Sequence, residues 1–211
     1  MTIKKLLKLN NAIYGPIDGQ LATIDDFFYY QEKYFLRFYA SVKNNKSQLP
    51  VNLCVALFWC IGFVIRFSID LESEIKKRYP HKCPYCLDSP CTCIFEKRNK
   101  IGKKTGRPVS GFPKDINGLQ DMIRKIYPVK KIDKIAIIDE LHSLSFLCRE
   151  FARKPSVSRL SKIKPATADL FILYLILANT NNINLTDEIE KTFYHGCYLC
   201  HKTPCQCYYT E

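Results

Sequence analysis

The chain has 211 residues and a mass of 24.6 kDa, which is long enough for one large domain or two small ones. With 47% hydrophobic and 25% charged residues, its composition is that of a globular protein and excludes wholesale disorder. The 32 Lys and Arg against 20 Asp and Glu give a net charge of +12, which favours anionic partners such as nucleotides, nucleic acid or acidic protein surfaces.

Helical patterns dominate the first half of the chain, because β-branched residues there do not alternate with polar ones. The patterns predict a short helix at 3–11, an aromatic-rich helix at 25–43, a buried helix at 51–67 and a short helix at 71–79. The apolar run at 53–65 is shorter than the roughly 18–20 residues that cross a bilayer. We therefore expect a core helix there and no membrane insertion.

A basic segment at 94–114 follows, with seven Lys or Arg, three Gly and two Pro, and it is typical of an exposed linker. Beyond it we expect a helix at 116–126 and another that starts at Asp133 or Asp139 and stops near Pro155. A helix after Pro165 is apolar on nearly all faces, and a short helix at 185–196 has Thr186 as its expected N-cap. The expected fold class is all-α.

The chain repeats itself after a gapless shift of 114 residues. Between 69–93 and 183–207, 11 of 25 positions are identical, which indicates duplication. We therefore expect a first repeat unit at 1–93, the linker at 94–114 and a second repeat unit at 115–211. Because a helix that is apolar on all faces must be covered on all sides, the two units are expected to pack as an intramolecular pseudo-twofold bundle.

Each repeat ends in the pattern His-x-Cys-x-x-Cys-x-x-x-Pro-Cys-x-Cys. Four closely spaced thiolates suit a tetrahedral metal ion, so the pattern predicts one structural Zn²⁺ for each repeat and leaves no open position for a catalytic water. The predicted ligands are Cys83, Cys86, Cys91 and Cys93 in the first repeat, and Cys197, Cys200, Cys205 and Cys207 in the second.

His81 and His195 are alternative ligands, because a Cys-x-Cys pair is difficult to close on one ion. His201 has no counterpart in the first repeat and is expected at the surface. The remaining cysteines, Cys54, Cys60 and Cys148, lie in apolar surroundings and are expected in the core. This use of cysteine, together with the lack of a recognisable signal peptide, is typical of a reducing, cytoplasmic location.

Residues 165–191, which include PATADLFILYLILANTNNINLTDEIEK, resemble the third helix and following turn of the MazG-like all-α nucleoside triphosphate pyrophosphohydrolases. In that family, two pairs of carboxylates on neighbouring helices bind Mg²⁺, which holds the triphosphate and activates the attacking water. The resemblance carries over one carboxylate of each pair, Glu140 and Asp169. The partners fall on Ser143 and Ala166, and the first repeat retains only Asp26.

The resemblance therefore implies a tandem MazG-like protein with degenerate catalytic carboxylates, a pseudoenzyme that binds nucleotides or acts as a protein scaffold. Asp139, Arg149 and Arg153 are candidate cofactor-binding or phosphate-binding residues beside Glu140 and Asp169. Alternatively, Asp169 is a buried structural residue paired with Arg149 or His142.

Two rival functions stay open. One is an active Mg²⁺-dependent nucleoside triphosphate pyrophosphohydrolase that uses Glu140 and Asp169. The other is a nucleic-acid-binding module that uses the linker, the zinc motifs and the positive charge. Because the duplication supplies two units in one chain, we expect a monomeric pseudo-dimer or a homo-oligomer.

Overall fold

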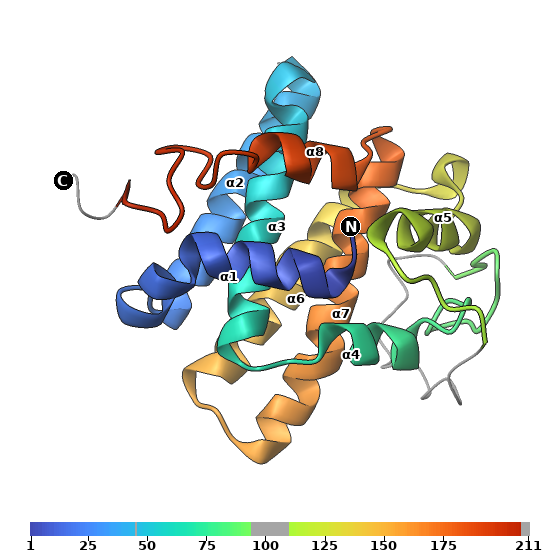
Figure 1. The fold of residues 1–211 in the computed structure, drawn as a ribbon. Helices are drawn as coiled ribbons and strands as arrows, with labels where there is room; N and C mark the ends of the chain where they lie inside the picture. Colours follow the sequence, from blue (N-terminus) through green and yellow to red (C-terminus); the bar gives the residue numbers. More distant parts are fainter. Residues whose placement is uncertain (45, 94–109, 208–211) are drawn as a thin grey trace. The chain divides into compact units, whose positions relative to one another are not determined.

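The computed structural model describes residues 1–44, 46–93 and 110–207. Most of the basic linker expected at 94–114, namely 94–109, lies outside these residues. The described residues form eight α-helices joined by turns and short 3₁₀ helices, and they contain no β-strand (Figure 1). The all-α prediction is confirmed for this part of the chain.

Two compact units divide the chain. Unit 1 comprises Met1–Ile69 and Asn184–Glu211, and unit 2 comprises Asp70–Ile183. Unit 1 contains α1 (Ile3–Gln20), α2 (Ile24–Asn44), η1 (Lys46–Gln48), α3 (Leu49–Arg66) and α8 (Leu185–Thr192). Unit 2 contains α4 (Leu71–Arg78), α5 (Ile116–Ile126), η3 (Val129–Lys131), α6 (Lys134–Arg153) and α7 (Val157–Thr180).

Helix α3 forms the centre of unit 1, and helix α7 forms the centre of unit 2. In unit 1, α2 lies alongside α3, which also contacts α1 and α8 (Figure 1). In unit 2, α6 lies alongside α7, which also contacts α4 and α5. Thirteen residues of α3 are buried, and α7 is buried continuously from Ala166 to Thr180. Each apolar helix is thus covered by helices of its own unit.

The compact units do not follow the boundaries of the sequence repeats. Helix α4 ends the first repeat but packs on α7 of the second, whereas α8 ends the second repeat and packs on α3 of the first. The exchange is reciprocal, and it carries the Cys motif that follows each helix. Either short helix can pack on the core helix of either repeat, because α4 and α8 bury equivalent apolar residues. These are Leu71 and Ile75 in α4 and Leu185 and Ile189 in α8.

The duplication is also visible in the backbone. The turn after α3 has Ser68 at φ 50°, and the turn after α7 has Asn182 at φ 55°, 114 residues later. The next helices begin at equivalent caps, because Asp70 accepts a hydrogen bond from the Ser73 N–H and Asn184 accepts from the N–H groups of α8. The predicted Thr186 cap was wrong, since Asn184 is the N-cap of α8 and Thr186 is buried within its first turn.

Two other helices are longer than expected. Helix α1 continues past Pro16 to Gln20, because Ile13 and Ile17 extend its buried stripe. Helix α7 begins at Val157, where the Ser156 hydroxyl caps the Arg159 N–H, and Pro165 lies inside the helix. The helical turns before Pro165 are largely exposed, so they tolerate the loss of the one backbone hydrogen bond that a proline removes.

Helix α3 is the one helix in the described part of the chain that is long and apolar enough to span a membrane by length and composition. Most of it is buried within unit 1, as a core helix of a globular unit would be. The same core contains Cys54 and Cys60, and Cys148 is buried in unit 2, as predicted for these three thiols.

Candidate metal centres and the Asp169 network

The first Cys motif brings four thiols together in unit 2. The Sγ atoms of Cys83, Cys86, Cys91 and Cys93 all lie within 4.8 Å of one another. Measured pairs are 3.6 Å for Cys83 and Cys93, 3.7 Å for Cys86 and Cys91, and 3.1 Å for Cys91 and Cys93. A tetrahedral zinc ion with Zn–S bonds of about 2.3 Å places its sulfurs about 3.8 Å apart. The cluster is close to that geometry, and all four cysteines are free of disulfides.

The second motif forms an equivalent cluster in unit 1 from Cys197, Cys200, Cys205 and Cys207, again with all Sγ atoms within 4.8 Å. Here Cys197 and Cys207 are 3.7 Å apart, and Cys200 and Cys205 are 3.9 Å apart. Among the described residues, these two clusters are the groups of three or more Cys, His, Asp or Glu side chains that could share one ion. Both predicted four-cysteine sets are therefore assembled, and each could hold a metal such as zinc.

The same backbone turn builds both clusters. Cys83 donates its N–H to the Asp88 carbonyl at 3.1 Å, and Cys197 donates to the Lys202 carbonyl at 3.0 Å. Leu87 and His201 occupy the left-handed region at φ 63° and 54°, which turns each chain back toward its first cysteine. The proline before the third cysteine of each motif follows a cis peptide bond.

Each cluster is anchored to the first helix of the opposite sequence repeat. The Cys91 N–H donates to the carbonyl of Ile126 at the end of α5, and the Cys205 N–H donates to the carbonyl of Ile13 in α1, both at 2.7 Å. Within each compact unit, the bond therefore joins a residue of one sequence repeat to a residue of the other. A metal bound to either cluster would therefore fasten the exchanged segment to the helices that receive it.

Two tyrosines place a hydroxyl beside the clusters, and neither was predicted from the sequence. The Tyr127 hydroxyl donates to Cys83 Sγ at 3.3 Å, and the Tyr14 hydroxyl is hydrogen-bonded to Cys197. Tyr14 and Tyr127 are 113 residues apart. The gapless shift of 114 was therefore wrong for the first helices, where a one-residue difference separates the repeats. An alignment that allowed one gap before the second helix would have paired them.

The thiols within a cluster differ in acidity. Hydrogen bonds from Cys91 and Tyr127 hold the pKa of Cys83 well below its usual range, at about 4, although burial opposes this shift. At Cys200 burial raises the pKa, but backbone hydrogen bonds from Gln206 and Lys202 lower it further, to about 7. The hydrogen bond to Cys83 raises the pKa of Cys91. Each cluster thus contains a readily ionised thiol beside a reluctant one, and a cation would compensate the combined charge of four thiolates.

The histidines lie beside the clusters and do not complete them. The His81 ring has its centroid 6.1 Å from that of Phe112, in an edge-to-face arrangement. His195 is exposed and packs edge-on against Tyr194, with the centroids 4.6 Å apart. Neither joins a metal-ligating group within the described residues. His201 is exposed, as expected from its lack of a counterpart.

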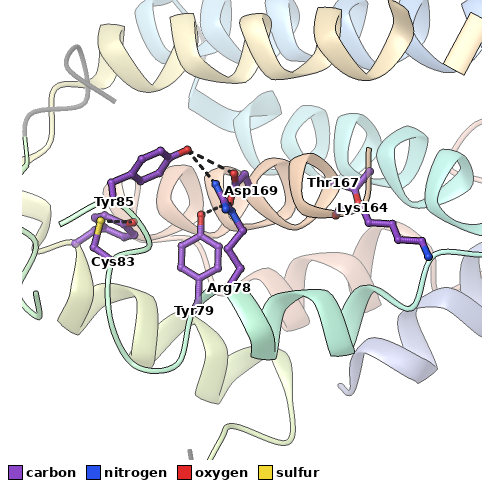
Figure 2. Close-up of polar contacts among 8 residues, drawn as sticks. Arg78, Tyr79, Cys83, Tyr85, Lys164, Thr167 and Asp169 are labelled. Carbon is purple, nitrogen blue, oxygen red and sulfur yellow. Dashed lines mark hydrogen bonds and ion pairs between the residues drawn. The ribbon is translucent and has the colours of Figure 1, made fainter. Parts of the chain in front are cut away.

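Asp169 lies on α7 and is a predicted catalytic carboxylate. It is contacted by side chains from the end of α4 and from the first Cys motif. The Arg78 Nε donates to Asp169 Oδ1 at 2.5 Å, and the Tyr79 hydroxyl donates to the same oxygen at 2.7 Å. The Tyr85 hydroxyl is 3.4 Å from Oδ2. Figure 2 shows the three side chains converging on Asp169, which is 4% exposed.

Electrostatics keep this network in its charged form. Burial lowers the pKa of Arg78, but the hydrogen bond and charge of Asp169 raise it by more, so the guanidinium stays protonated. Burial and the negative charge of Asp169 raise the pKa of Tyr79 well above its ordinary value. Tyr79 therefore remains a hydroxyl donor to the carboxylate. Asp169 is paired as the structural alternative expected, but with Arg78 rather than with Arg149 or His142.

The other predicted site residues lie on α6. Glu140 is half-buried and Asp139 is exposed, near the start of the helix. Arg149 is half-buried, whereas Arg153 is exposed and forms an ion pair with Glu150 at 3.2 Å. Asp26, which is the residue of unit 1 equivalent to Glu140, accepts hydrogen bonds from the backbone N–H and hydroxyl of Thr23 at the start of α2, both at 2.7 Å.

Comparisons with known proteins add no relative: no family model, no curated protein and no solved structure matches this chain.

Proposed function

We propose that this chain is a zinc-stapled, MazG-like helical pseudoenzyme that binds a nucleotide or acts as a protein scaffold. The observation that supports the proposal best is the ion pair between Asp169 and Arg78. A carboxylate that binds Mg²⁺ must turn an oxygen toward the ion, and Mg²⁺ requires near-octahedral oxygen ligands. Here Oδ1 accepts from both Arg78 and Tyr79, so the guanidinium supplies the positive charge that a metal would otherwise supply.

The first repeat supports the same interpretation from a different direction. Val55 occupies the position equivalent to Asp169 and is buried in α3, and Asn52 takes the place of the other carboxylate. The Asn52 amide donates to the Ser41 hydroxyl at 3.2 Å. Neither group is a metal ligand of the kind that a Mg²⁺-dependent hydrolase uses.

Zinc is the metal that we propose for both clusters. Four thiolates in a tetrahedral arrangement suit Zn²⁺, and their position at the ends of exchanged segments suits a structural role. Because the motifs connect repeats, zinc would stabilise the exchanged arrangement as well as the motif itself. We propose that the protein operates in a reducing, cytoplasmic environment, as a monomeric pseudo-dimer or a homo-oligomer, with its two sequence repeats related by a pseudo-twofold axis.

The distribution of charge favours an anionic partner for unit 2. Asp70–Ile183 contains 22 Lys and Arg against 12 Asp and Glu, whereas the residues of unit 1 include 10 and 8. Most of the net charge of +12 therefore belongs to unit 2. This asymmetry supports a nucleotide as the partner and also keeps nucleic acid as a second candidate.

The test measures pyrophosphate release and nucleotide binding on the same zinc-loaded protein. A panel of ribo- and deoxynucleoside triphosphates is offered with Mg²⁺ or Mn²⁺ to the parent, Asp169→Ala and Glu140→Ala. Glu150→Ala, which removes an exposed carboxylate from the same helix as Glu140, is the matched control. We expect no release above the protein-free background from any variant.

Release that is abolished by Asp169→Ala or Glu140→Ala but retained by Glu150→Ala would establish the active pyrophosphohydrolase instead. Calorimetric titration with the same nucleotides then separates nucleotide binding from scaffolding, and Arg149→Ala tests the proposed phosphate contact. Binding to single-stranded or duplex nucleic acid that weakens steeply with salt would favour the nucleic-acid-binding module.

A further inference from the structure

A recess in unit 1 combines a buried carboxylate with aromatic rings. Tyr14 and Asp18 of α1 and Phe58 and Trp59 of α3 line it, and the empty space among them is about 220 Å³, including the part that opens to solvent. Its enclosed part has room for a group about the size of a water molecule or an ammonium head. None of these residues belongs to the network around Asp169.

Asp18 is the unusual member of this recess. It is 9% exposed, and its carboxylate lies beside the rings of Phe58 and Trp59 in the lining of the recess. Arg66 is nearby, but its Nη1 donates to the backbone carbonyls of Asp18 at 2.7 Å and Ala22 at 3.3 Å. Burial raises the pKa of Asp18 to about 7, while the charge of Arg66 lowers it. Burial of a carboxylate carries a desolvation cost, and a cationic ligand would offset it.

The lack of a side chain at Gly62 allows the Asp18 carboxylate to occupy this position. A Cβ added to Gly62 of α3 would lie 2.9 Å from Asp18 Oδ2 and 2.7 Å from a ring carbon of Phe27. Glycine therefore lets the carboxylate approach α3 beside Trp59. Trp59 is in turn held by α2, because its ring stacks on Tyr30 with centroids 4.6 Å apart. The walls of the recess are thus fixed by packing from two helices.

From this arrangement we infer that the recess binds the ammonium head of a primary amine, with Asp18 as its anion and Tyr14, Phe58 and Trp59 as its aromatic walls. Aromatic faces attract cations through their quadrupoles, and a carboxylate adds direct charge complementarity. The Tyr14 hydroxyl is already bonded to Cys197. That leaves Asp18 as the oxygen donor among the lining side chains, which is too few for Mg²⁺ or Ca²⁺. The small enclosed space disfavours guanidinium and quaternary ammonium groups.

The experiment uses Trp59 as the reporter, since it is the single tryptophan of the chain. Zinc-loaded full-length protein is titrated with n-butylammonium at about pH 8, where Asp18 is ionised, and ionic strength is held constant with NaCl. We expect a saturable change in Trp59 emission. We expect Asp18→Asn to weaken the binding by at least about tenfold, because the isosteric amide removes the charge. Asp25→Asn, which removes a half-buried carboxylate at the start of α2 that does not line the recess, should bind within about twofold of the parent.

Three further arms sharpen the result. Tetramethylammonium should fail to compete. Gly62→Ala, which displaces the carboxylate without removing it, should also weaken binding and provides a second variant if Asp18→Asn does not fold. 1,4-Diaminobutane and N-acetyl-lysine amide distinguish a free polyamine from a lysine side chain of a protein partner.

Two results would overturn the inference: an emission change that grows linearly and matches the NaCl control, or equal binding by the parent and a folded Asp18→Asn variant. Circular dichroism and zinc content verify folding. The result is independent of the pyrophosphate assay, because it concerns a different unit and a cationic ligand.

Discussion

The two compact units share one helical plan but close it with different chemistry. In unit 2, the end of α4 and the motif after it surround Asp169 with Arg78, Tyr79 and Tyr85. The equivalent residues of unit 1 are Val55, Thr192, Phe193 and Leu199. There, Phe193 stacks on Phe58 of α3 with ring centroids 3.6 Å apart.

This difference shows what the fold itself requires. The helical plan forms with an apolar contact at this position in unit 1 and with a buried ion pair in unit 2. The carboxylate of Asp169 is therefore unnecessary for the architecture as such, and it is accommodated because Arg78 compensates its charge. A buried pair of this kind commonly adds little net stability, but removal of one partner leaves an uncompensated charge.

The largest expected effect is one that the two units share. Cys83→Ser in unit 2 and Cys197→Ser in unit 1 should each lower the zinc content from two ions to one per chain and destabilise the affected unit by about 5 kcal/mol or more. Elemental analysis and denaturant unfolding measure the two quantities. Cys60→Ser, at a buried thiol outside both clusters, controls for thiol loss alone and should keep both ions. Full zinc content in either cluster variant would contradict the proposed sites.

Arg78→Thr, by contrast, should separate the units. Thr192 stands at the equivalent place in unit 1, where no carboxylate needs a partner, but in unit 2 this change strands Asp169 and should cost about 3–5 kcal/mol. The triple variant Arg78→Thr, Tyr79→Phe and Asp169→Val gives unit 2 the residues of unit 1 and should recover at least about 2 kcal/mol of that loss. Unfolding by urea measures both.

The control for that comparison is the exposed ion pair on α6. Glu150→Ala breaks the contact with Arg153 and should change stability by no more than about 0.5 kcal/mol. If the triple variant proved as unstable as Arg78→Thr, the polar network would be required for packing in unit 2, and the equivalence of the two closures would fail.

The tyrosines beside the clusters should again act alike in both units. Tyr127→Phe and Tyr14→Phe each remove a hydroxyl that is bonded to the first cysteine of a cluster, and each should weaken zinc binding about tenfold. Competition with a chromophoric chelator measures the affinity. Tyr194 is exposed and directly precedes the second motif. Tyr194→Phe should leave the zinc affinity unchanged. Identical zinc affinity in all three variants would limit Tyr14 and Tyr127 to packing.

The sequence allowed the helices and the four-cysteine sets to be predicted because both depend on local patterns. Helix α3 follows from its continuous apolar run, and each Cys cluster closes within eleven residues. The exchange of α4 and α8 left no such trace. After a duplication, each short helix presents the same apolar residues to either repeat, so patterning cannot decide which one it covers.

The partner of Asp169 was missed for the same reason. Arg149 and His142 were the expected partners because they belong to the same repeat, whereas Arg78 reaches Asp169 only through the exchange. Tyr14 and Tyr127 were missed because one additional residue between the first two helices of the second repeat shifts them out of the 114-residue register. Long-range pairing and a single insertion thus account for what local patterns could not predict.

The smallest expected effect sharpens the comparison from the side of unit 1. Burial raises the pKa of Asp18 from 3.8 to about 7, so the folded state holds a proton that the unfolded state has released. The corresponding stability is complete below the unfolded pKa and is lost as the pH rises through the folded one, at about 1 kcal/mol between about pH 6 and pH 8. Asp18→Asn has no such proton and should lose correspondingly less stability over that interval. The charge of Arg66 lowers the pKa of Asp18, but burial has the larger effect and sets the sign. Unfolding of zinc-loaded parent and Asp18→Asn at both pH values measures the double difference, and Asp25→Asn should follow the parent. Equal pH dependence in the parent and Asp18→Asn would mean that the carboxylate is solvated in the folded protein, and the recess beside Trp59 would then lose its buried charge.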